Sequence, residues 1–173
     1  MACNITLSGI VYDCETNLAG VKKVYITDYS DVSAYTVSQG KCTALTLNAS
    51  AKFYEYTFQK NTASMTSTLT KDEANGYSFY TTELAGNINK LDVAKRNELT
   101  ELMGGRLTAI VVDKNDNSWI TGLDVYATGT AMTAQTGAAP EDGNYYNLTI
   151  TAESPEMPYG IDPSVYESLI SVA

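Results

Sequence analysis

Few side chains in this sequence could perform nucleophilic chemistry. The chain contains no histidine, which is the residue that most often activates a serine or cysteine nucleophile. No G-x-S-x-G turn occurs, and the single Gly-Lys pair, Gly40-Lys41, is followed by Cys42 and lacks the first glycine of a phosphate-binding loop. We therefore expect a protein that is not an enzyme.

Acidic and sulfur-bearing residues do not form a recognisable site either. The adjacent carboxylates Asp72-Glu73 and Glu141-Asp142 lie in loop-like sequence, where solvated charge is far more common than glycosidase chemistry. Residues 113–117 lack the glycine and the distal glutamate of an EF-hand loop, so a tight turn explains them. Three cysteines occur outside any C-x-x-C pattern: Cys3, Cys14 and Cys42. Without histidine they predict free thiols, and we expect no metal and no cofactor.

Composition predicts one folded domain. Of the 173 residues, 44% are hydrophobic and 18% are charged, which indicates a single domain over 1–160 with an extension at 161–173. The net charge of −9 disfavours tight binding to nucleic acid. It fits both a channel that DNA passes without adhering and simple solubility. The sequence shows no signal-peptide pattern and no long apolar run, so we expect no membrane contact and a reducing cytoplasm.

Alternation of apolar and polar residues predicts strands through most of the chain. Before the helix, the expected strands lie at 5–11, 23–28, 32–37, 43–47, 52–60 and 77–84. The strand at 23–28 is expected to bury one face. The pattern is strongest at 52–60, with Tyr54, Tyr56 and Phe58 on the expected core face. Residues 61–72 are rich in Thr and Ser and predict a mobile loop or a hairpin arm.

One amphipathic helix is predicted at about 91–103. Its apolar residues fall on one broad face: Leu91, Ala94, Leu99, Leu102 and Met103. Asn89 is the expected N-cap, and Gly104-Gly105 should end the helix. Together with the strands, this helix predicts a mainly β fold, a β-sandwich or half-barrel with one flanking helix, extended loops and a C-terminal arm.

A hairpin and a last strand are expected after the helix. Strands at 107–113 and 118–126 flank an Asn/Asp turn. We expect Trp119 on the core face of this hairpin. Residues 127–143 predict a loop or an irregular edge, and 144–153 a last strand, after which prolines should interrupt regular structure.

The periphery is the unusual part of the sequence. A Thr/Ser-rich arm, a small-residue loop and an apolar C-terminal extension could each complete a neighbouring subunit at an open sheet edge. They could equally fold back on their own domain. The candidate inter-subunit contacts are Met65, Leu69, Ile161, Val165, Tyr166, Leu169 and Ile170.

The order of these segments resembles a known group of proteins. The aromatic strand KFYEYTFQK, a polar arm, YSFYTTEL, a helix with an AKRN core, the hairpin LTAIVVDKNDNSWITGLDVY and the strand NYYNLTITAE follow one another in that order. This order, up to about residue 162, resembles virion structural proteins of tailed phages, many from phages of gut Bacteroidetes, that look like tail tube proteins. The order is specific, whereas no single motif is.

The resemblance implies a self-assembling structural protein. Subunits would join edge to edge into rings, hexameric in most such tubes, and the rings would stack around a channel through which DNA passes without specific binding. The implied partners are further copies of this chain, a tape-measure protein, a tail terminator and baseplate or hub proteins. The implied location is the virion tail, assembled in the cytoplasm of a bacterial host.

Two other functions stay open from the sequence. A head-to-tail ring, a stopper or a capsid-decorating protein could use the same fold and would stop at a closed oligomer. A carbohydrate- or cell-surface-binding module would place tyrosines and Trp119 along an exposed groove.

Overall fold

The structure, a computed structural model, describes residues 7–12 and 14–171 of the chain. It is mainly β, with one mixed open sheet of eleven strands, one α-helix and a short C-terminal helix. The strands are β1 (Val21–Asp28), β2 (Val32–Ser38), β3 (Lys41–Leu47), β4 (Tyr54–Tyr56), β5 (Ser64–Asp72), β6 (Tyr77–Asn89), β7 (Arg106–Asp113), β8 (Ser118–Thr121), β9 (Ala127–Gln135), β10 (Tyr145–Ser154) and β11 (Tyr159–Ile161). The helices are α1 (Val93–Gly104) and α2 (Pro163–Tyr166), with 3-10 turns at Tyr29–Asp31 and Glu167–Leu169. The expected mainly β class with one flanking helix is confirmed.

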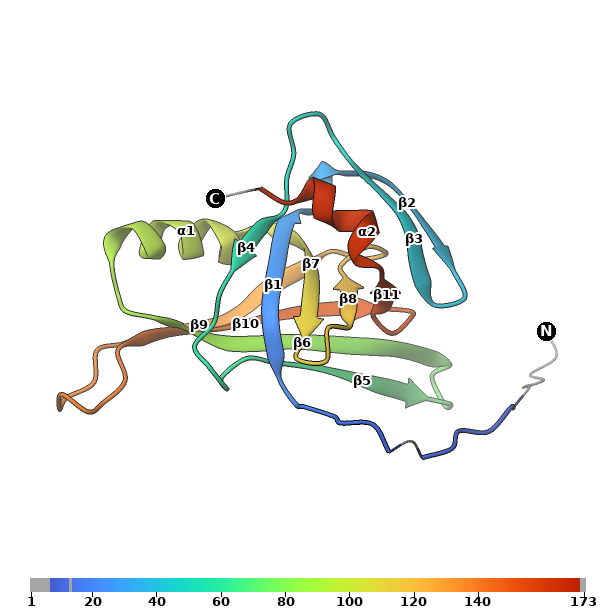
Figure 1. Cartoon of the computed structure of the whole chain (residues 1–173), viewed down its shortest axis with the longest axis horizontal. Helices are drawn as coiled ribbons and strands as arrows, with labels where there is room; N and C mark the ends of the chain where they lie inside the picture. Colours follow the sequence, from blue (N-terminus) through green and yellow to red (C-terminus); the bar gives the residue numbers. More distant parts are fainter. Residues whose placement is uncertain (1–6, 13, 172–173) are drawn as a thin grey trace.

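One continuous sheet supplies both layers of the fold. Its strand order is β2-β3-β11-β8-β7-β9-β10-β6-β5, and β1 pairs with the other side of β7, with β4 beyond it. Among the described pairs, β3 and β11 are parallel and the others antiparallel. β7 pairs with β8 over residues 109–112 but with β9 at residues 106 and 107. Figure 1 shows β5, β6 and β10 running across β1, β7 and β8, so the sheet folds over itself.

The main core fills the space between these crossing strands. It lies between β1 and β7 on one side and β6 and β10 on the other, and α1 closes one end. Its buried members are Val24, Ile26, Leu84, Ile88, Leu99, Leu102, Leu107, Ala109, Val111, Ala127, Tyr146, Leu148, Ile150 and Ala152. Strict alternation along β10 explains why this strand was predictable, since every second residue enters the core.

A second core covers the opposite face of β1 and β7. Tyr25, Ile110 and Val112 enter it, where β3, β11 and α2 supply the facing side chains. The expectation that 23–28 buries one face is therefore wrong, because Tyr25 is buried as well as Val24. Burial on both faces also explains the continuous apolar run of β7.

Helix α1 confirms the predicted helix with a different start. Asp92 is the N-cap, and its carboxylate accepts a hydrogen bond from the backbone N–H of Lys95 at 2.8 Å. Asn89 instead ends β6, so the predicted cap is wrong. The helix ends at Gly104 with Gly105 as the C-cap, so the predicted end is confirmed, although Gly105 is extended, with a φ of −86°, and not in the left-handed conformation expected of a capping glycine.

The segment at 52–60 is mostly not a strand. Tyr54–Tyr56 pairs with β1, and Phe53 forms a single parallel bridge with Ile170. Phe53 is fully buried in the second core, whereas Tyr54 is 54% exposed, so the predicted core face is wrong at Tyr54. Tyr56 and Phe58 do pack on the main core. The chain crosses from one core to the other here, which a strand with one buried face cannot do.

Two segments expected to be irregular are strands. Residues 64–72 form β5, which pairs with β6 along its whole length, so the hairpin alternative is confirmed and the mobile loop is wrong. Residues 127–135 form β9 against β10. Both have polar, Thr-rich sequences with a weak apolar pattern. They are strands because they pair with neighbouring strands in the sheet.

The ends of the chain differ from the predictions. Residues 7–12 are not a strand, and Ile5, in the same predicted strand, lies outside the described residues. After the prolines the chain regains regular structure as β11 and α2, so the prediction of an irregular end is wrong.

Candidate assembly surfaces

The C-terminal residues predicted to contact another subunit pack on their own chain. Ile161 and Tyr166 are buried members of the second core. Val165, Leu169 and Ile170 pack against the same core. Contact with another copy stays a prediction for these residues, and Ile161 and Tyr166 have almost no surface to offer one.

Backbone hydrogen bonds fix this segment beside β4. The Phe53 N–H donates to the Leu169 carbonyl at 2.9 Å, and the Ser171 N–H donates to the Phe53 carbonyl at 2.8 Å. Lys41 also forms an ion pair with Asp162 at 2.8 Å. The alternative that this extension folds back on its own domain therefore describes the structure.

Met65 and Leu69 lie on β5, the last strand of the sheet. The Met65 side chain packs partly against the main core, and Leu69 is 49% exposed. β5 hydrogen-bonds to β6 on one side, and no other described strand pairs with it. Its outer edge therefore offers backbone N–H and C=O groups to another chain.

Among the end strands β5, β4 and β2, β5 is the least protected. β4 has three residues, and β2 carries register shifts after Val32 and after Thr36 that bend its edge. β5 has nine residues in unbroken register with β6 and no charge from Ser64 to Thr70. Short strands, bulges and charges are the devices that block pairing at an edge. β5 has a charge only at its last two residues.

β9 presents a second free edge on the opposite side of the same group of strands. It pairs with β7 only at Ala127 and Thr128, whereas its pairing with β10 runs to Gln135. Residues 130–135 are exposed and have no described strand on their other side. We call β9, β10, β6 and β5 the four-strand layer. Figure 1 shows the β9–β10 hairpin of this layer extending beyond the body of the fold.

The outward face of the four-strand layer is polar and lacks cations. Register and alternation place the following residues on it: Ser64, Thr66, Thr68, Thr70, Asp72, Tyr77, Phe79, Thr81, Glu83, Ala85, Asn87, Asn89, Thr128, Ala131, Thr133, Gln135, Tyr145, Asn147, Thr149, Thr151 and Glu153. The charges among them are carboxylates, at Asp72, Glu83 and Glu153. The four strands therefore offer no cation to a phosphate group on this face. Arg106 of β7, which pairs with Thr128 and stacks on Tyr126, is a cation at the border of the face.

Residues 7–12, which we call the apolar segment, form the most exposed apolar surface of the described chain. Leu7, Ile10, Val11 and Tyr12 have exposed fractions between 82% and 102%. The sequence indicated these residues only as a strand. Their apolar character was visible, but their position outside the sheet was not.

The β7–β8 turn holds the chain that follows the apolar segment. The Leu18 N–H donates to Asn115 Oδ1 at 2.8 Å, and Asn115 Nδ2 donates to Asn17 Oδ1 at 2.9 Å. Lys22 forms an ion pair with Asp116 of the same turn. The base of the segment is therefore fixed, while its apolar side chains are almost fully exposed within the described part of the chain.

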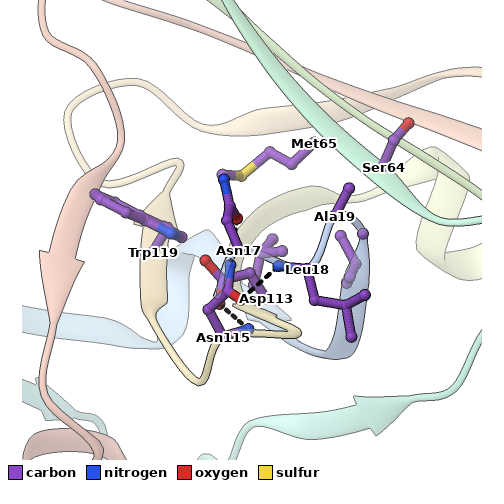
Figure 2. Close-up of a pocket in the computed structure, with 11 residues that line it drawn as sticks. Asn17, Leu18, Ala19, Ser64, Met65, Asp113, Asn115 and Trp119 are labelled. Atoms are coloured by element: carbon purple, nitrogen blue, oxygen red, sulfur yellow. Dashed lines mark hydrogen bonds between the residues drawn. The ribbon is translucent and has the colours of Figure 1, made fainter. Parts of the chain in front are cut away.

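A pocket of about 300 Å³ lies beside this base, between the first residues of β5 and the β7–β8 hairpin. Its apolar lining comes from Leu18, Val21, Met65, Val111 and Trp119. We call it the Trp119 pocket. Figure 2 shows Trp119 on one side of the pocket and Ser64 with Ala19 on the other. Trp119 pairs directly with Val111 of the main core, so it lies on the core-facing side of the hairpin as predicted, where it is half-buried and lines the pocket.

Three hydroxyl groups meet one carboxylate at the end of the second core. Asp124 accepts hydrogen bonds from Tyr35 at 3.0 Å, Tyr159 at 2.7 Å and Ser154 at 3.4 Å. Burial and the bond to Asp124 raise the pKa of the Tyr159 hydroxyl, so it stays protonated and donating. This cluster joins β2, β10 and β11 and has a structural role.

The two described cysteines differ in solvent exposure. Both are free thiols, with Cys14 exposed and Cys42 buried. Burial raises the pKa of the Cys42 thiol, which disfavours the reactive thiolate. Cys3 lies outside the described residues.

No group of three or more Cys, Asp or Glu side chains in the described residues is placed to hold a metal ion. Within the same part of the chain, no helix has the length and apolar character needed to cross a membrane. Comparison of the chain with protein-family models, with curated proteins and with solved structures finds no match.

Proposed function

We propose that this chain is a structural subunit of a phage tail tube, which assembles with copies of itself into stacked rings and performs no catalysis. The observation that carries the proposal is the four-strand layer. It combines two free edges, β5 and β9, with an outward face whose charges are all acidic. Subunits joined through these edges would extend the layer from one copy to the next.

Edge-to-edge joining explains why two different edges are left open. Pairing of β5 in one copy with β9 in the next is a head-to-tail contact, and such contacts close into a ring when the rotation between copies allows it. Both edges are uncharged over most of their length, which permits backbone pairing. The order of segments that resembles tail tube proteins gives independent support.

The acidic outward face suits the wall of a DNA channel. Nucleic-acid affinity comes mainly from Lys and Arg on phosphates, and these four strands turn neither residue outward. Carboxylates such as Glu83 and Glu153 repel the DNA backbone, so DNA would pass without being held. The particle would be assembled in the host cytoplasm, with tape-measure, terminator and hub proteins as further partners.

The test is electron microscopy of the purified protein in negative stain across a concentration series, with mass measured in parallel. Long hollow tubes would support the proposal. Closed rings that do not stack would favour the adaptor or stopper function instead. A monomer at every concentration would contradict self-assembly and would move attention to the surface-binding alternative.

A further inference from the structure

The apolar segment and the Trp119 pocket are complementary surfaces on the same chain. The segment exposes Leu7, Ile10, Val11 and Tyr12, which nothing in the described chain covers. The pocket has an apolar lining that includes Met65 and Trp119. A monomer leaves both surfaces in water, which is unfavourable in proportion to the apolar area exposed.

The segment does not fill the pocket of its own chain. Hydrogen bonds from Asn115 fix residues 17 and 18 at the pocket wall. From there the chain leaves the body of the fold, as Figure 1 shows, so that residues 7–12 lie away from the pocket. The β7–β8 turn therefore sets a direction that points the segment outward.

The length of the free chain allows it to reach a neighbour. The ten residue steps from Leu7 to Asn17 span at most about 33–36 Å when extended. A domain of this size has a radius of gyration of about 16 Å, so this reach is comparable with the width of one subunit.

We infer that the apolar segment of one copy docks into the Trp119 pocket of a second copy, with Ile10, Val11 and Tyr12 as the inserted side chains. The inference rests on the proposed self-assembly of this chain. Ser64 and Met65, the first residues of β5, line the pocket, so it is continuous with the free edge proposed to receive the next subunit. Each copy supplies one segment and one pocket, and the contact can therefore repeat from subunit to subunit.

The test is a disulfide cross-link between two separately purified variants. One carries Ile10→Cys and the other Ala19→Cys, both in a Cys3→Ser, Cys14→Ser background in which Cys42 is buried. Ala19 lies on the pocket wall and is exposed, so neither change should affect folding. Mixing the two under mild oxidation should give a covalent dimer that contains one copy of each variant. A matched mixture with Thr16→Cys in place of Ile10→Cys should give much less.

Two results would overturn the inference. The first is the absence of a dimer in the mixture. The second result comes from a chain that carries both Ile10→Cys and Ala19→Cys. If a cross-link forms only within single copies of that chain, the segment returns to its own pocket, and the inference is overturned.

Charge substitutions test the docking contact, and comparing the cross-link with tube formation tests docking and the proposed function separately. Val11→Asp should abolish the cross-link, whereas Thr16→Asp, an equal charge change on the exposed base, should leave it. Tubes without a cross-link would contradict segment docking and leave the proposed function standing. A cross-link without tubes or rings at any concentration would contradict the tube and leave the docking standing.

Discussion

The hydroxyl groups of Ser118 and Tyr166 lie 2.8 Å apart in a buried hydrogen bond that joins β8 to α2. This bond ties the C-terminal segment to the hairpin at the centre of the sheet. The two residues are separated by 48 positions in sequence. The segment after the prolines is therefore part of the core.

Tyr166→Phe should destabilise the fold by about 1–3 kcal/mol, because it leaves the Ser118 hydroxyl buried without a partner. Chemical denaturation of the single variants and of Ser118→Ala/Tyr166→Phe measures this coupling. The double variant should recover most of the loss, since it removes both polar groups. A double variant as unstable as the sum of the two single variants would show that the hydrogen bond contributes nothing.

Removal of residues 163–171 should unfold the domain. The truncation takes Tyr166 and its apolar neighbours away from the second core and exposes Phe53, which is fully buried in the intact chain. A docking arm would behave differently, since its loss would block assembly and leave a folded monomer. Circular dichroism and thermal unfolding of the truncated chain distinguish the two, and a cooperative transition at the temperature of the full chain would restore the docking-arm hypothesis.

Leu99→Ala in α1 should cost about 2–5 kcal/mol, the usual range for truncation of a buried leucine. Leu99 is 1% exposed and packs into the main core between the crossing strands. Val93→Ala on the same helix is the control, because Val93 is 72% exposed and should change stability by no more than about 0.5 kcal/mol. Equal effects of the two substitutions in urea denaturation would mean that α1 does not pack as described.

Sequence periodicity located elements that bury one regular face. Strand β10 was predicted closely because its burial alternates. Helix α1 was located correctly, but only Leu99 and Leu102 of its predicted apolar face are buried, while Ala94 is exposed and Leu91 precedes the helix. The Asn/Asp turn after β7 was also visible, since Asp113 accepts hydrogen bonds from the backbone of Asn115 and Asn117. These features depend on residues close together in the chain.

Features that depend on distant partners were not predictable from the sequence alone. β5 is a strand because β6 pairs with it, although its Ser/Thr sequence has no strong apolar pattern. Phe53 is buried because the C-terminal segment returns to cover it, which no local period encodes. The apolar segment shows the converse, since residues 7–12 have strand-forming side chains but no described strand to pair with. The candidate assembly surfaces thus became visible only when the edges of the sheet were known.

Acid should weaken the start of α1. Hydrogen bonding of the Asp92 carboxylate to the Lys95 N–H lowers its pKa below the ordinary value of 3.8 in the folded chain. The unfolded chain therefore takes up the proton first, and the stability from this cap is present above pH 3.8 and lost as the pH falls through the folded pKa. Asp92→Asn keeps a capping side chain that does not titrate. Its melting temperature should fall less steeply than that of the parent chain in this acidic range, whereas Asp92→Ala should already be less stable at neutral pH.

The free edge of β5 gives the sharpest test of assembly. Thr68 and Thr81 are directly paired across β5 and β6 and face outward together. Thr68→Lys places a charge on the open edge strand, where lysine opposes the addition of another strand. Thr81→Lys places the same charge on the same face but on a strand that is paired on both sides. Both changes are expected to leave thermal stability nearly unchanged, because both side chains lie on the outward face.

We expect Thr68→Lys to prevent tube formation in electron microscopy and Thr81→Lys to permit it. Tubes formed equally well by both variants would exclude β5 as the joining edge and would direct the search to β2, while the loss of tubes in both would assign the effect to the charge of the channel wall.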